Sequence, residues 1–401
     1  MAKYRLLYAL IYIGAAAFAL AYESKLTFVL FIGAAALPVI TLILMILSGL
    51  LLKLEVVPDS DYVGKLQDFG IKVRVINRFI LPVSPMMIIG TFHDRSGNVI
   101  EGRRLVLNAA ALRKCEYVFD GHIRCRGEYM LGVERAEIFD LLRIFRFRLR
   151  NAPMCRVIVT PRRVMLDETT ALCTDDYDSS ITKISFMESG SFASVRKYED
   201  GDLMKHVHWK LSAKHDELMV RQSEQNLGSS ALIITDLHAF SEVGDDNSIA
   251  ADSAVEAALA LTRKIITDGR TAMNVYRPGE GRTDVFSASK TEDYEKLLMI
   301  FSVIPVTETG KGAEALVPRA AEYLTGSEPL FIITPELDGE AFAAILRTVG
   351  SSCGEIRIYL TASKPDRRLL AEANAAKNAS VWTIDHEDIS LSLRNSMSPE
   401  G

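Results

Sequence analysis

The chain has 401 residues, a formal net charge of −5 and 49% hydrophobic residues. Its length exceeds one ordinary globular core and predicts two or three structural units. The acidic balance disfavours nucleic-acid binding, because no global positive field is present to hold phosphates, while the apolar content predicts a membrane portion. The five cysteines lack paired short spacings, which indicates reduced thiols rather than zinc knuckles or redox dithiols.

Two uncharged apolar runs open the chain. Residues 6–22 and residues 26–52 are apolar or small, and residues 23–25 separate them. Because about 20 such residues cross a bilayer core, residues 1–53 are predicted to form a transmembrane helical hairpin. The alternative is a cleaved signal peptide followed by one helix, but the bulky Tyr22 does not suit a cleavage site.

Basic residues flank the outer ends of this hairpin. Lys3 and Arg5 precede the first run and Lys53 follows the second, while the connecting turn holds only Lys25. Cytoplasmic ends are typically the more basic ones, and a hairpin returns the chain to its starting side. We therefore expect a two-span protein of the cell membrane with both termini and the soluble domains in the cytoplasm. Neither run carries a charge, so the helices are predicted to be an anchor rather than an ion pathway.

Residues 54–164 contain short runs in which apolar and polar residues alternate. In residues 71–75, Ile71, Val73 and Val75 alternate with Lys72 and Arg74. Such runs between polar turns are typical of strands, and their number predicts a small antiparallel, immunoglobulin-like sandwich. The pattern does not determine its topology.

A basic and aromatic stretch lies near the end of this segment. Its four arginines, which alternate with apolar residues, are Arg143, Arg146, Arg148 and Arg150. One interpretation is contact with anionic lipid headgroups close to the anchor. The other, which we favour from sequence, is a strand with one solvated face.

Residues 165–194 are polar and predicted to be a linker, and residues 195–228 then concentrate charge, histidine and one of the two tryptophans. This segment resembles the signature of the domain of unknown function 58 family. The residues that fall on the signature are Arg196, Tyr198, Gly201, Asp202, Trp209, Lys210, Ser212, Ala213 and Lys214. Lys205 stands where the family usually has arginine, and Val207 where it usually has isoleucine. The family commonly begins with two membrane helices and a β segment, as this chain does.

The signature allows two local structures. Asp202 is a good N-cap, so a short helix from Leu203 is preferred, although a strand would place His206, His208 and Lys210 on one face. In either case Arg196, Asp202 and Lys210 are spaced to form a charge network. We expect that network to clamp the linker onto the following domain and to form a docking surface.

The same residues permit two chemical alternatives. Asp202, His206 and His208 are candidate metal ligands, but a His-x-His pair without a further nearby ligand is weak evidence for zinc. Ser212 with a histidine is a candidate nucleophile, yet no nucleophile elbow accompanies it. We therefore expect no catalytic residue and no metal at this segment.

Residues 229–390 alternate apolar strands with helices, which predicts a parallel sheet covered on both faces. The family resemblance implies a von Willebrand factor A-like version of this fold, and residues 391–401 are expected to be a disordered tail. The predicted strands are residues 231–235, 271–276, 330–334, 356–361 and 380–384, and the predicted helices are residues 253–267, 292–301, 340–349 and 366–377.

That fold often binds a divalent ion through an Asp-x-Ser-x-Ser stretch after its first strand. Here Asp236 keeps the aspartate, but His238 and Phe240 replace both hydroxyl residues. Because magnesium requires oxygen ligands, we expect a degenerate site without metal, to which Thr334 and Asp338 are the candidate assisting residues.

The sequence therefore predicts a membrane-anchored, non-enzymatic scaffold or adaptor without a cofactor. The family resemblance implies a MoxR-type AAA+ ATPase as its partner and a transglutaminase-like membrane protein as a neighbour. Two alternatives stay open: an enzyme that uses Asp202, His206, His208 and Ser212, and a metal-dependent adhesion module at Asp236. The process and the oligomeric state are not determined by the sequence.

Overall fold

The chain divides into two compact units, Met1–Thr160 and Pro161–Gly401, and each is described by itself. The computed structural model describes residues 2–22, 24–93, 99–150, 153–167, 195–197, 212, 219–221, 230–241, 243–279, 282–307, 312–324, 326, 328–350, 352–376 and 378–397.

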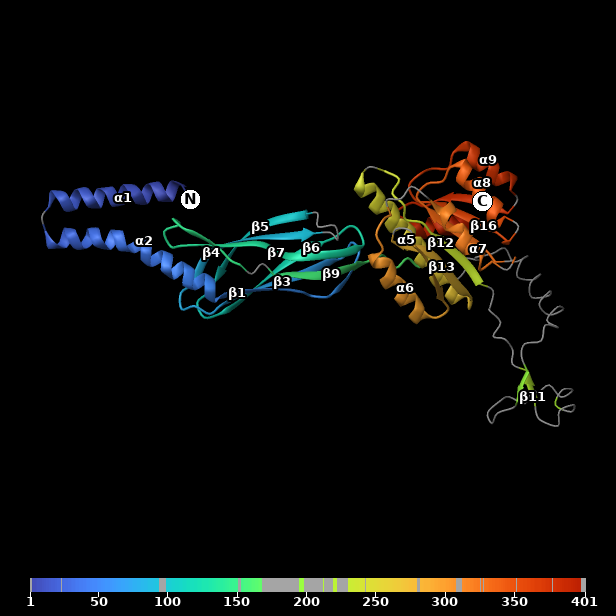
Figure 1. The fold of residues 1–401 in the computed structure, drawn as a ribbon, viewed down its shortest axis with the longest axis horizontal. Helices are drawn as coiled ribbons and strands as arrows, with labels where there is room; N and C mark the ends of the chain where they lie inside the picture. The colour runs from blue at the N-terminus through green and yellow to red at the C-terminus, as the bar shows by residue number, and fades with distance from the viewer. Residues whose placement is uncertain are drawn as a thin grey trace. The chain divides into compact units, whose positions relative to one another are not determined.

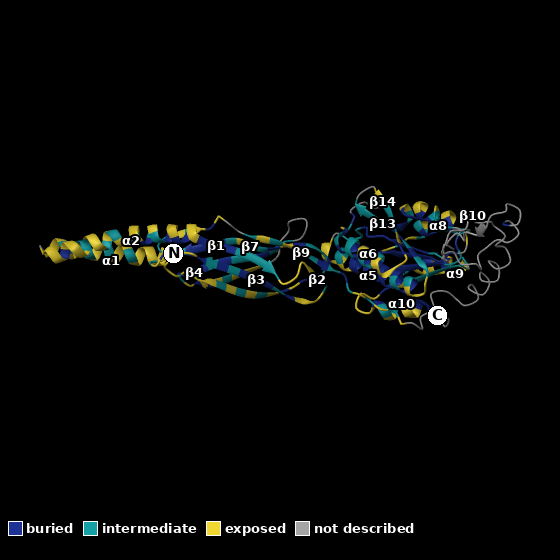
Figure 2. Ribbon diagram, turned by 90° about the horizontal axis from the view of Figure 1, so that it is seen from below, coloured by how far each residue is buried: buried dark blue, intermediate teal, exposed yellow. Residues whose placement is uncertain are grey.

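The first unit begins with two antiparallel helices, α1 (Ala2–Ala21) and α2 (Lys25–Leu51) (Figure 1). Both are long and apolar enough to cross a membrane, so the predicted pair of candidate spans is present. Ser24 caps α2 by accepting a hydrogen bond from the backbone N–H of Leu26, as serine commonly does at this position. Most of the outer surface of both helices is exposed, as expected for helices that face lipid (Figure 2).

Two sheets follow the helices. One has the order β1-β3-β6, and the other has the order β2-β9-β7-β4-β5 with β8 on β7; all pairs are antiparallel except β2 with β9. Val75 of β3 and Ile88 of β4 belong to one buried cluster, so the sheets pack face to face, as predicted for a sandwich. The strands are β1 (Leu52–Pro58), β2 (Tyr62–Gly64), β3 (Asp68–Asn77), β4 (Val83–His93), β5 (Val99–Ala109), β6 (Lys114–His122), β7 (Gly127–Phe139), β8 (Arg146–Arg148) and β9 (Met154–Thr160).

One side of the last third of α2 packs against the sandwich. Met45 is buried in the cluster that joins the two sheets, and Leu42 packs against it. Gly49 lies against β8, where an added Cβ would be 2.6 Å from the ring of Phe147. The candidate span Lys25–Leu51 therefore also has a side that faces protein, which the sequence did not predict.

The second unit contains a six-stranded sheet of order β14-β13-β12-β15-β16-β17. Its strands are β12 (Ser230–Thr235), β13 (Thr271–Gly279), β14 (Arg282–Ala288), β15 (Leu330–Thr334), β16 (Ile356–Leu360) and β17 (Ala379–Thr383). All neighbours are parallel except β14, which forms a hairpin with β13. The predicted parallel strands are present, but the antiparallel edge strand β14 was not predicted. A separate ladder pairs β10 (Val195–Lys197) with β11 (Met219–Arg221).

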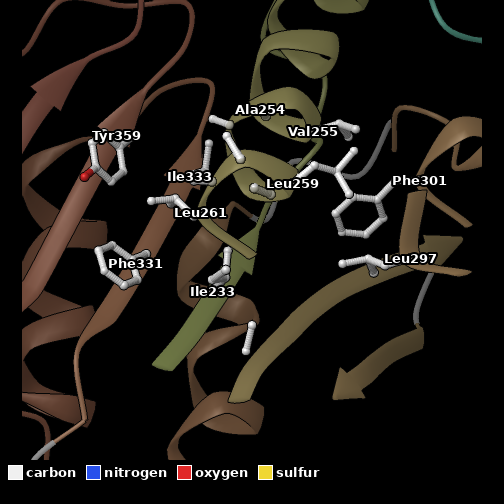
Figure 3. Close-up of a cluster of buried hydrophobic side chains, with 14 of the residues drawn as sticks. Ile233, Ala254, Val255, Leu259, Leu261, Leu297, Phe301, Phe331, Ile333 and Tyr359 are labelled. Carbon is white, nitrogen blue, oxygen red and sulfur yellow. The ribbon is translucent and has the colours of Figure 1, made fainter. Parts of the chain in front are cut away.

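Helices cover both faces of this sheet. One face packs against α5 (Gly244–Thr267), α6 (Thr291–Val303) and α10 (Ile389–Met397). The other packs against α7 (Val317–Ala321), α8 (Gly339–Val349) and α9 (Arg367–Ala375). Successive strand residues point to opposite faces. Ile233 lies in one buried cluster with Leu259 and Phe331 (Figure 3), whereas Leu232 lies in the cluster of the opposite face, which contains Phe342 of α8.

Residues 391–397, which were expected to be part of a disordered tail, form most of α10. Ile389, Leu393 and Met397 recur every four residues and are buried in the same cluster as α5. The hydroxyl groups of Tyr359 and Ser396 are 2.9 Å apart inside the core. The tail prediction was therefore wrong for these residues, because their helical apolar stripe completes the core.

Candidate functional site

The strand order places a topological switch point between β12 and β15. From β12 the chain passes through α5 to β13 on one side, and it later returns to β15 on the other side. In open α/β sheets, ligands bind outside the carboxyl ends of the strands at such a point. Asp236 directly follows β12 and Thr334 ends β15, so both lie at this position.

A buried hydrogen-bonded group of three side chains occupies the switch point. His238 Nδ1 lies 2.7 Å from Asp236 Oδ2, and Thr334 Oγ1 lies 2.9 Å from the same oxygen. Asp236 is 1% exposed and His238 is 7% exposed. The backbone of residues 237–239 is held by two hydrogen bonds of 2.9 Å with Thr307. This arrangement fixes the imidazole against the carboxylate.

The charge of the imidazole is set by opposing effects. Burial lowers the pKa of His238, but the hydrogen bond that its imidazole donates to Asp236 and the negative charges of Asp236, Glu336 and Glu314 together raise this pKa above its ordinary value. Asp236 therefore favours the protonated form of His238, and we call these two side chains the ion pair.

A loop packs over the ion pair. An added Cβ at Gly312 would lie 3.4 Å from His238 Cε1 and 3.5 Å from Asp236 Oδ2. Arg277 donates a hydrogen bond to the carbonyl oxygen of Gly312, at 3.1 Å, and the Gly312 N–H donates one to Glu314, at 3.0 Å. An added Cβ would thus be in ordinary contact with the ion pair and tight only against Glu314 Oε2, at 2.9 Å.

These residues do not fit a divalent metal. Near Asp236, positions 238 and 240 carry an imidazole and a phenyl ring, whereas magnesium needs oxygen ligands. The imidazole instead contacts the carboxylate directly, and the described residues contain no group of three or more histidine, cysteine or acidic side chains that suits a metal. Asp338, a candidate assisting residue, caps α8 by accepting a hydrogen bond from Ala341 N, whereas Thr334 does join Asp236.

Most of the signature segment lies outside the described residues, so its charge network stays a prediction. Arg196 lies in β10 opposite Val220, and Ser212 is buried. The predicted residues outside the described part are Tyr198, Gly201, Asp202, Lys205, His206, His208, Trp209, Lys210 and Lys214. The role of His238 as the partner of Asp236 was missed from sequence, although Asp-x-His directly after a buried strand was the available signal.

A second concave site lies at the surface of the second unit. Its volume is about 270 Å³, and it is lined by Arg163, Arg263, Ile266, Thr267, Thr291, Tyr294 and Glu295. Arg163 forms two hydrogen bonds with Glu295, of 2.7 and 2.9 Å, and Arg263 lies 5.9 Å from the centre of the Tyr294 ring. Both cations are thus engaged by the protein itself, which makes this cavity a weaker candidate than the switch point.

Comparison with known proteins identifies the family of one segment. Residues 194–313 match the family described as Protein of unknown function DUF58, which confirms the resemblance seen in the signature. No curated protein matches the chain.

Several solved structures are similar to part of the chain. The CARDB domain of a Pyrococcus furiosus protein, solved with di-metal ions, is 18% identical, with 27% of this chain and 86% of that chain covered and a TM-score of 0.20. The C-terminal domain of wzt is 10% identical, with coverages of 31% and 84% and a TM-score of 0.24. The sporulation control protein Spo0M of Bacillus subtilis is 9% identical, with coverages of 37% and 58% and a TM-score of 0.20. Likenesses of this size do not identify the fold of either unit.

Proposed function

We propose that this DUF58-family chain is a membrane-anchored, non-enzymatic scaffold that presents its α/β unit to a protein partner in the cytoplasm. The proposed partner is a MoxR-type AAA+ ATPase, and a transglutaminase-like membrane protein is the proposed neighbour. Both follow from the family resemblance. The von Willebrand factor A-like and immunoglobulin-like assignments of the two units belong to the same proposal.

The observation that carries this proposal is the closed switch point. The carboxylate at the position where α/β proteins bind ligands is already paired with His238, and Gly312 packs over it. Oδ2 of this carboxylate is thus engaged by His238 and Thr334 of the protein itself. This favours a function in which the surface of the unit is recognised by another protein.

The proposed orientation is tested with a membrane-impermeant thiol reagent on intact cells. Cysteine would replace Ser24 in the connecting turn or, as the matched control, the exposed Leu66 in the β unit, on a background without native cysteines. We expect the reagent to reach position 24 in intact cells and position 66 only after lysis. The reverse pattern would place the soluble units outside the cytoplasm and exclude a cytoplasmic ATPase as partner.

The proposed partner is tested by affinity capture from native membranes, followed by mass spectrometry. The wild type is compared with an Asp202→Ala, Lys210→Ala variant, which removes two charged signature residues. Recovery of an AAA+ ATPase with the wild type alone would support both the partner and the docking segment. Equal recovery with a correctly folded variant would reject the docking segment, and recovery of no ATPase with either protein would reject the partner.

A further inference from the structure

Three loops share the end of the β unit at which α2 enters. β1 begins where α2 ends, and its first residue pairs with the last residue of β3. β6 starts at the same end, because its first residue pairs with Ile76 of β3. β4 also starts there, where it pairs with Ala109 of β5, and β7 ends there, where it pairs with Met86 of β4. The loops of residues 78–82, 110–113 and 140–145 therefore lie together at the helix end of the unit, which we call the helix-proximal face.

The helix-proximal face combines exposed apolar tips with positive charge. Ile80 is 70% exposed, Leu112 65% and Leu141 78%, one from each loop. Soluble surfaces rarely gather large apolar side chains in this way unless they bind something. The exposed basic side chains in and next to these loops include Arg78, Arg113, Lys114, Arg143, Arg146 and Arg148; Lys114 pairs with Glu116 and Arg146 with Glu137. The single acidic residue of the three loops, Asp140, is buried.

Direct contacts set the depth of one loop relative to the helices. Arg5 Nε donates a hydrogen bond of 2.9 Å to the carbonyl oxygen of Ile144, and Thr41 Oγ1 donates one of 3.3 Å to Asp140 Oδ2. Arg143 lies 5.6 Å from the centre of the Tyr4 ring. The loop of residues 140–145 is therefore level with the first turns of α1 and with the middle of α2.

The length of α1 then places this loop at the membrane boundary. The apolar residues 6–21 span about 24 Å at a rise of ~1.5 Å per residue, which is less than a hydrocarbon core of about 30 Å. A helix of this length can cross the hydrocarbon core only if Arg5 lies at the edge of the core or is drawn into the core. Whatever is bonded to Arg5 must then lie among the lipid headgroups.

We propose that the helix-proximal face binds the bilayer, with Ile80, Leu112 and Leu141 in the interfacial layer and the arginines on the phosphates of anionic phospholipids. Apolar side chains beside basic ones are the combination that binds such an interface. The inference rests on the proposed membrane anchoring and adds that the β unit itself contacts lipid. It also changes the interpretation of residues 143–150, for which the sequence favoured a merely solvated strand face.

The test uses the full-length chain in nanodiscs, with a fluorescent label on single cysteines in a background without native cysteines. Labels replace Leu112 and Leu141 on the face, Leu66 at the opposite end of the β unit as the matched control, and Leu30 in α2 as a monitor of anchoring. We expect brominated lipid to quench the labels at 30, 112 and 141 and to leave the label at 66 bright. Quenching at 30 without quenching at 112 and 141 would overturn the inference alone. Loss of quenching at 30 as well would overturn the anchoring and the inference together.

The lipid charge is tested by a second matched pair. Arg113 precedes β6 and Arg124 follows it, so Arg113→Glu and Arg124→Glu reverse one charge at opposite ends of the same strand. The measured quantity is the ratio of lipid-facing to water-facing label at position 112, in nanodiscs that contain phosphatidylglycerol. Arg113→Glu should lower this ratio by about fivefold or more, and Arg124→Glu should leave the ratio unchanged. Equal behaviour of both variants, or equal quenching in phosphatidylcholine alone, would remove the anionic headgroup from the proposal.

Discussion

His238 Nδ1 and Asp236 Oδ2 lie 2.7 Å apart at the carboxyl end of β12, and both side chains are buried. The hydrogen-bond partner of this carboxylate is thus a histidine of the chain itself. The pair closes the point of the sheet at which related folds bind ligands. It is the observation on which the proposed function, based on protein contacts, rests.

The ion pair should make stability depend on pH. Because the folded-state pKa of His238 is raised above its ordinary value of about 6.5, its stabilising effect is complete below that value and disappears as pH rises through the folded pKa. We expect the difference in free energy of unfolding between the wild type and His238→Gln to shrink as pH rises. Chemical denaturation of the two proteins at several pH values measures this difference. A difference that does not change with pH would contradict a charged imidazole.

Hydroxyl residues at positions 238 and 240 should create a magnesium site. In His238→Ser, Phe240→Ser the internal cation is removed and two oxygen ligands join Asp236 and Thr334. We expect magnesium to stabilise this variant by about 2.7 kcal/mol at a concentration 100 times its dissociation constant, and not the wild type. Thermal unfolding with and without magnesium measures the effect, and adding Asp236→Asn should abolish it. An unresponsive double variant would show that the loop at Gly312, rather than His238, closes the site.

The segment that follows β9 should contribute to the stability of the second unit. Arg162 Nε lies 2.8 Å from Oε2 of the fully buried Glu256 of α5, whereas the neighbouring Arg163 pairs with the exposed Glu295 of α6. Arg162→Ala should cost about 2–3 kcal/mol because it leaves a buried carboxylate without this ion pair. Arg163→Ala should cost less than about 1 kcal/mol, as exposed pairs do. Denaturant unfolding compares the two variants, and equal costs would contradict the structural role of Arg162.

Helix α10 should be part of the folded core. Leu393 is fully buried and the nearby Leu391 is exposed, so the two offer a matched comparison on one helix. Leu393→Ala should lower the free energy of unfolding by about 3 kcal/mol through loss of packing, and Leu391→Ala by less than about 0.5 kcal/mol. If both substitutions were neutral, α10 would be dispensable and the earlier expectation of a tail would stand.

The features that could be predicted from sequence are those encoded by long, regular patterns. The uncharged run of residues 26–52 produced α2, and the apolar runs of residues 231–235 and 330–334 produced the buried strands β12 and β15. The family match over residues 194–313 confirmed what the signature residues indicated. These patterns are local, so one sequence is enough to detect them.

The features that were missed depend on contacts between distant residues. The pairing of β14 with β13, the burial of Met45 beneath strands and the docking of Leu393 against α5 each require a partner that is far away in the chain. Short amphipathic segments such as residues 389–397 carry too little pattern to be separated from a tail. The pair of Asp236 and His238 is different. The spacing of the two residues is visible in the sequence, but their burial and the distance between their side chains are not.

The central claim, a membrane-anchored scaffold that docks an AAA+ ATPase through its signature segment, is tested most directly by binding between purified components. The full-length chain in nanodiscs would be titrated with the purified MoxR-type ATPase from the same cells, with and without nucleotide. We predict a saturable complex with the wild type that weakens at least tenfold, or about 1.4 kcal/mol, in Asp202→Ala, Lys210→Ala. No complex under any nucleotide condition, or equal affinity for both proteins, would contradict the account.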